Sequence, residues 1–135
     1  MMDPIVVSCC HCRDCQRITG SAFALDAMIE TPRVELVSGR PVQLHRGGAR
    51  AWRCGTCFSL LWADHPALGD AFRFVRIGTL DDAESLVPDV HFFVRSKHPW
   101  VVVPDDVPQF ETLPANGMGA TLSPDRRARL DAATG

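Results

Sequence analysis

Clustered cysteines constrain this chain more than any other feature of its sequence. The six cysteines form two groups. The first group is Cys9, Cys10, Cys12 and Cys15, and the second is Cys54 and Cys57. No apolar run approaches the ~20 residues of a membrane span, and residues 5–7 are too short for the core of a signal peptide. We therefore expect a cytoplasmic protein, in a reducing compartment where thiols are more often metal ligands or redox groups than structural disulfides.

Length and charge limit the classes of protein to consider. A chain of 135 residues that is 46% hydrophobic can bury one continuous core. Its 14 basic and 16 acidic residues give a formal net charge of -2. That balance lacks the positive field that a phosphate backbone or an anionic membrane attracts, so we expect neither nucleic acid nor membrane as a partner.

Short apolar runs broken by glycine and proline predict a mainly β chain. In residues 23–30, Phe23, Leu25, Ala27 and Ile29 alternate with other side chains, which is the period of a strand. Further strands are expected at residues 34–37, 42–45, 51–53, 60–62, 72–77, 90–95 and 100–103. One helical turn is expected at residues 14–18.

The C-terminal part of the chain differs in composition. From Thr112 onward it is poor in large apolar residues, and Ser123 with Pro124 predicts the cap and first position of a short helix ending near Ala132. We expect one domain over residues 1–111, and a mobile, weakly docked tail over residues 112–135.

The first cysteine group has the spacing of metal ligands. If residues 6–12 are extended, Cys10 and Cys12 point to one face while Cys9 and His11 point to the other. A turn after Cys12 can then bring Cys15 beside them. Three thiolates leave a tetrahedral zinc one ligand short, and such an open position is typical of catalytic zinc.

Two other interpretations of this group are open. Cys9 or His11 could complete a closed, structural four-ligand site, although each side chain would have to reverse its direction. A CxxC could also cycle as a dithiol, but such a pair usually follows a strand and opens a helix in a βαβ unit, which this pattern does not indicate.

Four motifs, in order, resemble the glutathione-dependent formaldehyde-activating (GFA) family, which includes the centromere protein V type. Residues 10–21, CHCRDCQRITGS, look like its signature. The other similar segments are Cys54-Gly55-Thr56-Cys57 with Ser59-Leu60-Leu61-Trp62, then Gly78-Thr79-Leu80-Asp81-Asp82, and finally His91 through Ser96-Lys97 to Trp100. The resemblance covers roughly residues 5–111.

The resemblance implies several short coiled antiparallel β-sheets around zinc-binding cysteine knuckles. It also implies a zinc-dependent carbon–sulfur lyase-type enzyme that acts on adducts of glutathione, or a similar thiol, with a small aldehyde, like S-(hydroxymethyl)glutathione synthase. The catalytic zinc would be held by Cys10, Cys12 and Cys15. The alternatives are a non-catalytic zinc-stabilised module that binds a thiol or a protein, and a degenerate family member.

The second cysteine pair departs from the family pattern. The resemblance implies that Cys54 and Cys57 form half of a structural zinc site, whose other half is an N-terminal CxCG motif that is absent from this sequence. We therefore expect an incomplete site, in a chain that is truncated relative to the family or has lost this zinc. Gly55 and Phe58 replace the usual Pro and Gly, and a bulky Phe58 tolerates the positive φ of a knuckle badly.

Three polar side chains beside the first group are candidates for binding glutathione. Arg13, Gln16 and Arg17 could meet its carboxylates, because guanidinium groups bind carboxylate in fork geometry. Solvated surface arginines are the alternative. His91 lies in an apolar run, which favours a hydrogen-bonded core histidine over a proton shuttle. The sequence leaves the oligomeric state open.

Overall fold

The structure, a computed structural model, describes residues 3–46, 48–115 and 118–135. Its strands are β1 (Val6–Cys10), β2 (Ala24–Glu30), β3 (Val42–Arg46), β4 (Ala49–Arg53), β5 (Leu60–His65), β6 (Gly69–Arg76) and β7 (Val90–Phe92). The α-helices are α1 (Arg13–Thr19) and α2 (Pro124–Thr134). Short 3-10 turns are η1 (Thr31–Arg33), η2 (Ile77–Thr79), η3 (Ala83–Ser85), η4 (Val94–Ser96) and η5 (Met118–Thr121).

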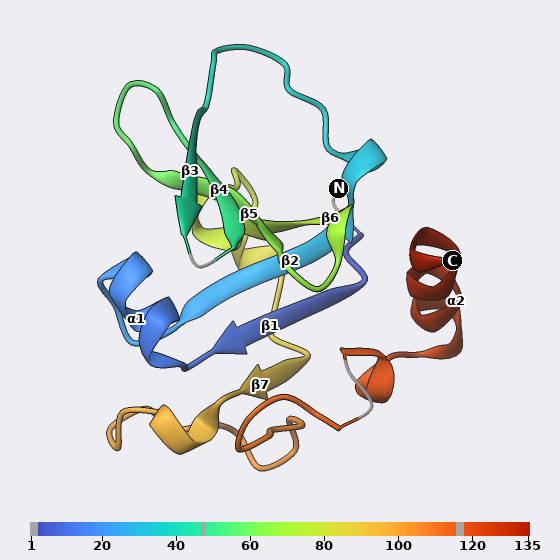
Figure 1. The fold of residues 1–135 in the computed structure, drawn as a ribbon. Coiled ribbons are helices and arrows are strands. Elements are labelled where there is room, and N and C mark those ends of the chain that lie inside the picture. Colours follow the sequence, from blue (N-terminus) through green and yellow to red (C-terminus); the bar gives the residue numbers. More distant parts are fainter. Residues whose placement is uncertain (1–2, 47, 116–117) are drawn as a thin grey trace.

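The strands form one hydrogen-bonded sheet in the order β3-β4-β5-β6-β2-β1-β7. The sheet is strongly twisted, so that β3 and β4 cross the direction of β1 and β2 (Figure 1). The predicted mainly β fold is confirmed, although the expected several antiparallel sheets are one mixed sheet. Adjacent strands of a hairpin pair antiparallel, whereas β7 returns after a crossover through residues 77–89 and pairs with β1 in parallel.

Most predicted strands are present, with shifted ends, but two are wrong. Residues 34–37 and 100–103 are apolar and β-branched, yet they form no strand. Val37 and Val102 are mostly exposed, and within the described part of the chain neither run pairs with a strand. The strand expected over residues 90–95 ends at Phe92, because Phe93 takes a left-handed conformation with φ 56°.

Alternation along β1 sends successive side chains into two apolar clusters. On one face of the sheet, Val6 packs in a buried cluster whose members are Ile5, Val6, Met28, Phe72, Val90 and Phe92. On the other face, Val7 packs with Ala27 and Ile77. Burial on both faces fixes the register of β1, since a slip of one residue would exchange the two sets.

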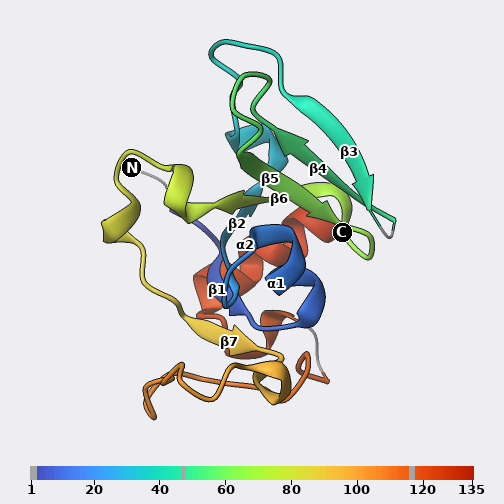
Figure 2. The ribbon, with the colours of Figure 1, turned by 90° about the vertical axis from the view of Figure 1, so that its left-hand side faces the viewer.

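Helix α2 begins where the sequence predicts, because the Ser123 hydroxyl accepts from the Arg126 amide and Pro124 is the first helical residue. Leu130 packs against the first apolar cluster. Helices α1 and α2 lie at opposite ends of β1 and β2 (Figures 1 and 2). The domain boundary after residue 111 and the mobility of the tail stay predictions.

Neither α1 nor α2, the α-helices of the described residues, combines the length and hydropathy that crossing a bilayer requires.

Candidate metal centre

The first cysteine group spans the end of β1, a turn and the first turn of α1. Cys12 is extended, with φ -64° and ψ 157°, and serves as the N-cap of α1. Its Sγ accepts a hydrogen bond of 3.3 Å from the backbone amide of Cys15. Gly20 ends the helix in the left-handed conformation. A short capped helix therefore folds Cys15 back over the end of the strand.

Three sulfur atoms meet at this turn. The Sγ atoms of Cys10, Cys12 and Cys15 all lie within 4.8 Å of one another, and all three residues are half-buried. Tetrahedral zinc with Zn–S bonds of about 2.3 Å would place its sulfur ligands about 3.8 Å apart. The donor set and its spacing therefore fit zinc, and this group could hold such an ion.

Hydrogen bonds among the thiols favour one negative charge in the cluster. The Cys10 sulfur accepts a hydrogen bond from the Cys15 thiol and another from the Cys12 amide. These two hydrogen bonds lower the pKa of Cys10 to about 6. The contact between Cys10 and Cys15, together with burial, raises the pKa of Cys15. Burial raises the pKa of Cys12. Cys10 is therefore the thiol of this group that most readily becomes a thiolate, which is the form that binds metal.

Cys9 and His11 lie on the other side of β1, as alternation predicts. Cys9 is 2% exposed, and burial, with the charge of Asp26, raises its pKa to about 12. His11 is fully buried, and its Nε2 lies 2.9 Å from Nδ1 of His91. Among the described residues, the metal-capable group contains neither of them.

The two histidines form a buried pair beneath the cluster. Burial lowers the pKa of His11 to about 4, and the neighbouring charge of His91 adds to the effect. Burial also lowers the pKa of His91. Both rings are therefore neutral at pH 7, so one donates a hydrogen bond to the other. His91 is the hydrogen-bonded core histidine that the sequence predicts.

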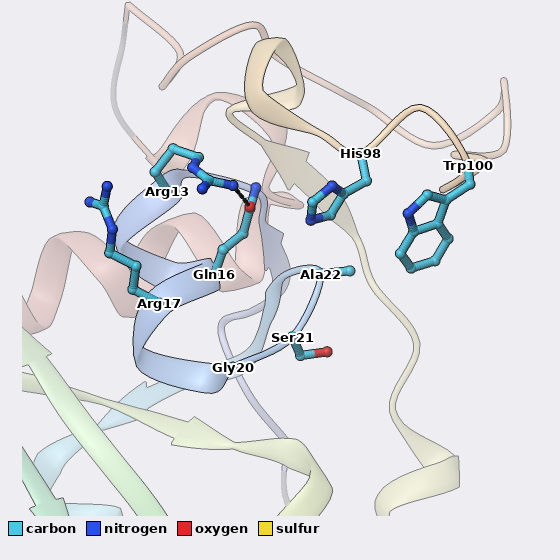
Figure 3. Close-up of a pocket in the computed structure, with 8 residues that line it drawn as sticks. All are labelled: Arg13, Gln16, Arg17, Gly20, Ser21, Ala22, His98 and Trp100. Carbon is cyan, nitrogen blue, oxygen red and sulfur yellow. Dashed lines mark hydrogen bonds between the residues drawn. The ribbon is translucent and has the colours of Figure 1, made fainter.

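A concave site of about 430 Å³ lies against α1 (Figure 3). Its lining comes from one face of α1, the turn after it and the segment after η4, and consists of Arg13, Gln16, Arg17, Gly20, Ser21, Ala22, His98 and Trp100. The His98 and Trp100 rings stack with centroids 5.6 Å apart and planes 12° apart. Trp100 is 72% exposed, so its ring is available to a ligand.

All three predicted glutathione-binding residues line this concave site, but their side chains differ in how strongly other protein groups hold them. Gln16 is 6% exposed, and its Nε2 donates to the carbonyls of His11, at 2.7 Å, and Ser96, at 3.0 Å. Its Oε1 accepts from Arg13. Gln16 therefore positions Arg13, whereas Arg17, 62% exposed and 3.5 Å from Asp14, can reach a ligand.

The sequence does not single out His98 and Trp100, which are two of the residues that line the concave site. The sequence predicts a strand over residues 100–103, whereas the structure leaves Trp100 exposed beside the concave site. The signal that could have identified them is the failure of that run to alternate, since Trp100 and three valines follow one another directly.

The second cysteine pair lies in the turn between β4 and β5. The Phe58 amide donates to the Cys54 carbonyl at 3.0 Å, and the Thr56 amide lies 3.4 Å from Cys54 Sγ. Phe58 takes φ 60°, the conformation that its bulk argues against. In the described parts of the chain no third metal-capable side chain joins this pair. Zinc at Cys54 and Cys57 stays a prediction.

Comparison with family models identifies the family of this chain. The model of a family described as "Glutathione-dependent formaldehyde-activating enzyme" matches residues 1–96. The matched segment contains both cysteine groups and α1, and it ends before His98 and Trp100. A search of curated proteins finds no match.

Proposed function

This chain belongs to the glutathione-dependent formaldehyde-activating enzyme family, and on that basis we propose that it is a zinc-dependent carbon–sulfur lyase-type enzyme. The reaction resembles that of S-(hydroxymethyl)glutathione synthase. The sulfur of glutathione, or of a similar thiol, bonds to the carbonyl carbon of a small aldehyde, and the thiol proton ends on the aldehyde oxygen. The reverse reaction breaks the same bond. We place it in the cytoplasm, where glutathione is kept reduced.

The observation that carries this proposal is the convergence of three cysteine sulfurs at the start of α1, the helix that also lines the concave site. Cys10, Cys12 and Cys15 would hold the zinc, which when bound lowers the pKa of a thiol or water in its fourth position. Cys9 and His11 are buried on the far side of β1. The fourth position is therefore left to a ligand that approaches from solvent.

The concave site offers groups that match glutathione. Arg13 and Arg17 are exposed side chains of α1 that line the concave site (Figure 3), and guanidinium groups bind the carboxylates of a peptide in fork geometry. Gln16 holds Arg13 in place through a hydrogen bond. The stacked rings of His98 and Trp100 offer a flat face to the peptide part of the ligand.

Binding is the first test. Glutathione is titrated into the zinc-loaded protein, followed by NMR shifts of α1 amides and of the Trp100 indole. We expect saturable shifts at millimolar thiol or below, and a Kd raised about fivefold in Arg17→Gln, since a charge-assisted hydrogen bond contributes about 1 kcal/mol or more. Arg127→Gln, in α2 at the other end of β1, is the matched control. No shift at millimolar glutathione would contradict the proposal.

Catalysis is the second test. NMR exchange spectroscopy follows the interconversion of two states, free formaldehyde plus free glutathione on one side and their adduct on the other. Wild-type protein should accelerate the exchange, and Cys12→Ser should abolish the acceleration. Binding without acceleration would contradict the lyase and identify the non-catalytic thiol-binding module instead.

A further inference from the structure

The two edges of the sheet differ in how they are covered. At one edge the segment over residues 108–112 runs along β7, where the His91 amide donates to the Pro108 carbonyl at 2.9 Å and the Phe110 amide donates to the His91 carbonyl at 3.0 Å. At the other edge β3 pairs with β4, and no strand of the described residues pairs with the outer side of β3. The outer backbone groups of β3 are therefore open to a further strand.

Strand β3 lacks the features that usually protect an edge. Its five residues, Val42–Arg46, pair with β4 in one uninterrupted register. They include no proline and no lysine, and residues 42–45 are all exposed. The strand also lies at the outer margin of the molecule (Figure 2). Prolines, lysines and bulges are what natural proteins use to prevent an edge from pairing with other chains, so β3 is suited to accept an extended segment.

Exposed apolar side chains concentrate in this part of the chain. Of the nine large apolar side chains that are exposed among the described residues, five belong to β3, to the segment before it or to the β4–β5 turn. These five are Leu36, Val37, Val42, Leu44 and Phe58. Alternation places Val42 and Leu44 on one face of β3. An occupant with apolar side chains at alternate positions would therefore pack against them.

The same part of the chain is strongly basic. Residues 36–63 contain four arginines and no aspartate or glutamate, in a chain that has 16 acidic residues. Arg40 is exposed just before β3, and Arg53 pairs with the first residue of β3. Within the described ranges neither guanidinium forms an ion pair, and that of Arg53 donates to the Phe58 carbonyl at 2.8 Å. Carboxylates on the occupant would supply the missing counter-charges.

These features favour an acidic peptide over a nucleic acid or a second copy of this chain. Base stacking requires a free aromatic face, but the Trp52 ring beside β3 stacks on Trp62 with centroids 5.7 Å apart. The guanidinium carbons of Arg73 and Arg50 also lie 4.6 Å and 5.4 Å from the Trp52 centroid. A second copy would bring the same unpaired arginines to the edge, and like charges would repel.

We propose that β3 is a docking edge for an extended acidic segment of a partner protein, which adds to the sheet as a further strand. Its apolar side chains pack against Val42 and Leu44, and its carboxylates lie near Arg40 and Arg53. Four strands separate β3 from β1, which carries Cys10. The proposal therefore does not depend on the lyase activity.

A synthetic peptide tests this proposal on the zinc-loaded full chain. The probe is a capped peptide of about eight residues in which glutamate and valine alternate, and its control has lysine in place of glutamate. NMR titration should show saturable shifts and slowed hydrogen exchange at β3 amides with the glutamate peptide, but no shift at α1 amides. Added salt should weaken this binding. No saturable shift at millimolar peptide, or equal affinity for the two peptides, would overturn the proposal.

Variants of exposed residues test the contacts. Leu44→Glu should raise the Kd of the glutamate peptide at least about tenfold, because it replaces an apolar contact with a like charge. Arg40→Gln, which removes an exposed charge without touching the core, should raise it about threefold. Val102→Glu, at an 86% exposed valine outside this region, is the matched control and should change the Kd by less than about twofold. An unchanged Kd in both Leu44→Glu and Arg40→Gln would overturn the proposal.

Two further measurements address the other occupants. Oligothymidylate, a single-stranded nucleic acid, is titrated in the same way, and weaker binding than that of the glutamate peptide is expected. Tighter binding of oligothymidylate at β3 would overturn the peptide assignment. The free protein is also measured over a range of concentrations, where β3 shifts should stay constant. Shifts that grow with protein concentration would assign the edge to a second copy and likewise overturn the proposal.

Discussion

At the scale of single residues, Gln16 connects the fold to the candidate site. One buried amide ties α1 to the carbonyls of His11 and Ser96, and it also holds Arg13. We expect Gln16→Met to lower the free energy of unfolding by about 1 to 3 kcal/mol, because two buried carbonyls lose their donor. Denaturant unfolding measures this change. Arg17→Met should stay within about 0.5 kcal/mol of wild type, since Arg17 is largely exposed, and equal effects of the two variants would contradict the role of Gln16.

Cys9 and Cys12 make a second residue-scale prediction. Cys9→Ala should leave the zinc content of the first group unchanged, because the Cys9 side chain is buried away from the other sulfurs. Cys12→Ser should weaken zinc binding at least about tenfold, because it removes a thiolate ligand. Competition with a chromophoric chelator measures both. Loss of zinc from Cys9→Ala would show that Cys9 is a fourth ligand and that the site is closed.

The arrangement of the cysteines was predictable from spacing, whereas the concave site beside them was not. Alternation along a strand depends on neighbouring residues alone, so Cys9 and Cys10 could be assigned to opposite faces without a structure. His98 and Trp100 lie about 80 residues beyond the end of α1 along the chain. Their approach depends on β7 pairing with β1, for which no local pattern gives a signal.

At the scale of elements, helix α2 is attached by charged groups that respond to pH. The Arg129 side chain donates to the Glu30 carboxylate at 2.7 Å and 2.8 Å, and it also contacts Asp3. The hydrogen bond from Arg129 is the main reason that the pKa of Glu30 is lowered to about 2. Because the folded state favours the carboxylate, this stabilisation is complete above about pH 4.5 and decreases as the pH falls toward 2.

We therefore expect Arg129→Gln to lower the free energy of unfolding by about 1 to 2 kcal/mol at pH 7, and by less at pH 3. Comparison of the variant with wild type at each pH isolates this pair from other titrating groups, such as Asp26, whose pKa burial raises to about 6. Asp131→Asn is the control, since its ion pair with Arg127 lies within α2. A loss for Arg129→Gln that is the same at pH 3 and pH 7 would contradict this account.

The wrong strand predictions also belong to the scale of elements. Residues 34–37 have the same β-branched character as residues 42–45, yet only the latter form a strand, because β4 follows directly and pairs with them. Among the residues that the structure describes, no strand pairs with residues 100–103. The β propensity of a segment indicates that it can adopt an extended conformation. It becomes a strand only where a neighbouring strand is placed to pair with it.

At the scale of the whole molecule, the three candidate metal ligands contribute little to the apolar core. The two apolar clusters join β1, β2, β6 and β7, and Cys10 only borders one of them. The three ligands lie within six residues, so an ion there closes only short loops and removes little entropy from the unfolded chain. Alternation in the sequence predicts that both faces of β1 carry apolar side chains. Which residues pack together in each cluster depends on the strand order, which alternation does not give.

Removal of zinc from the Cys57→Ser protein, where only the first group is left to bind it, should therefore leave the fold intact. We expect a chelator to lower Tm by about 10 °C, as mass action on a ligand of the folded state requires, with far-UV circular dichroism and dispersed methyl resonances retained. Loss of zinc should broaden resonances of α1 and of the end of β1 alone. A metal-free chain without dispersed resonances would contradict this expectation and show that the zinc is needed for the core to form.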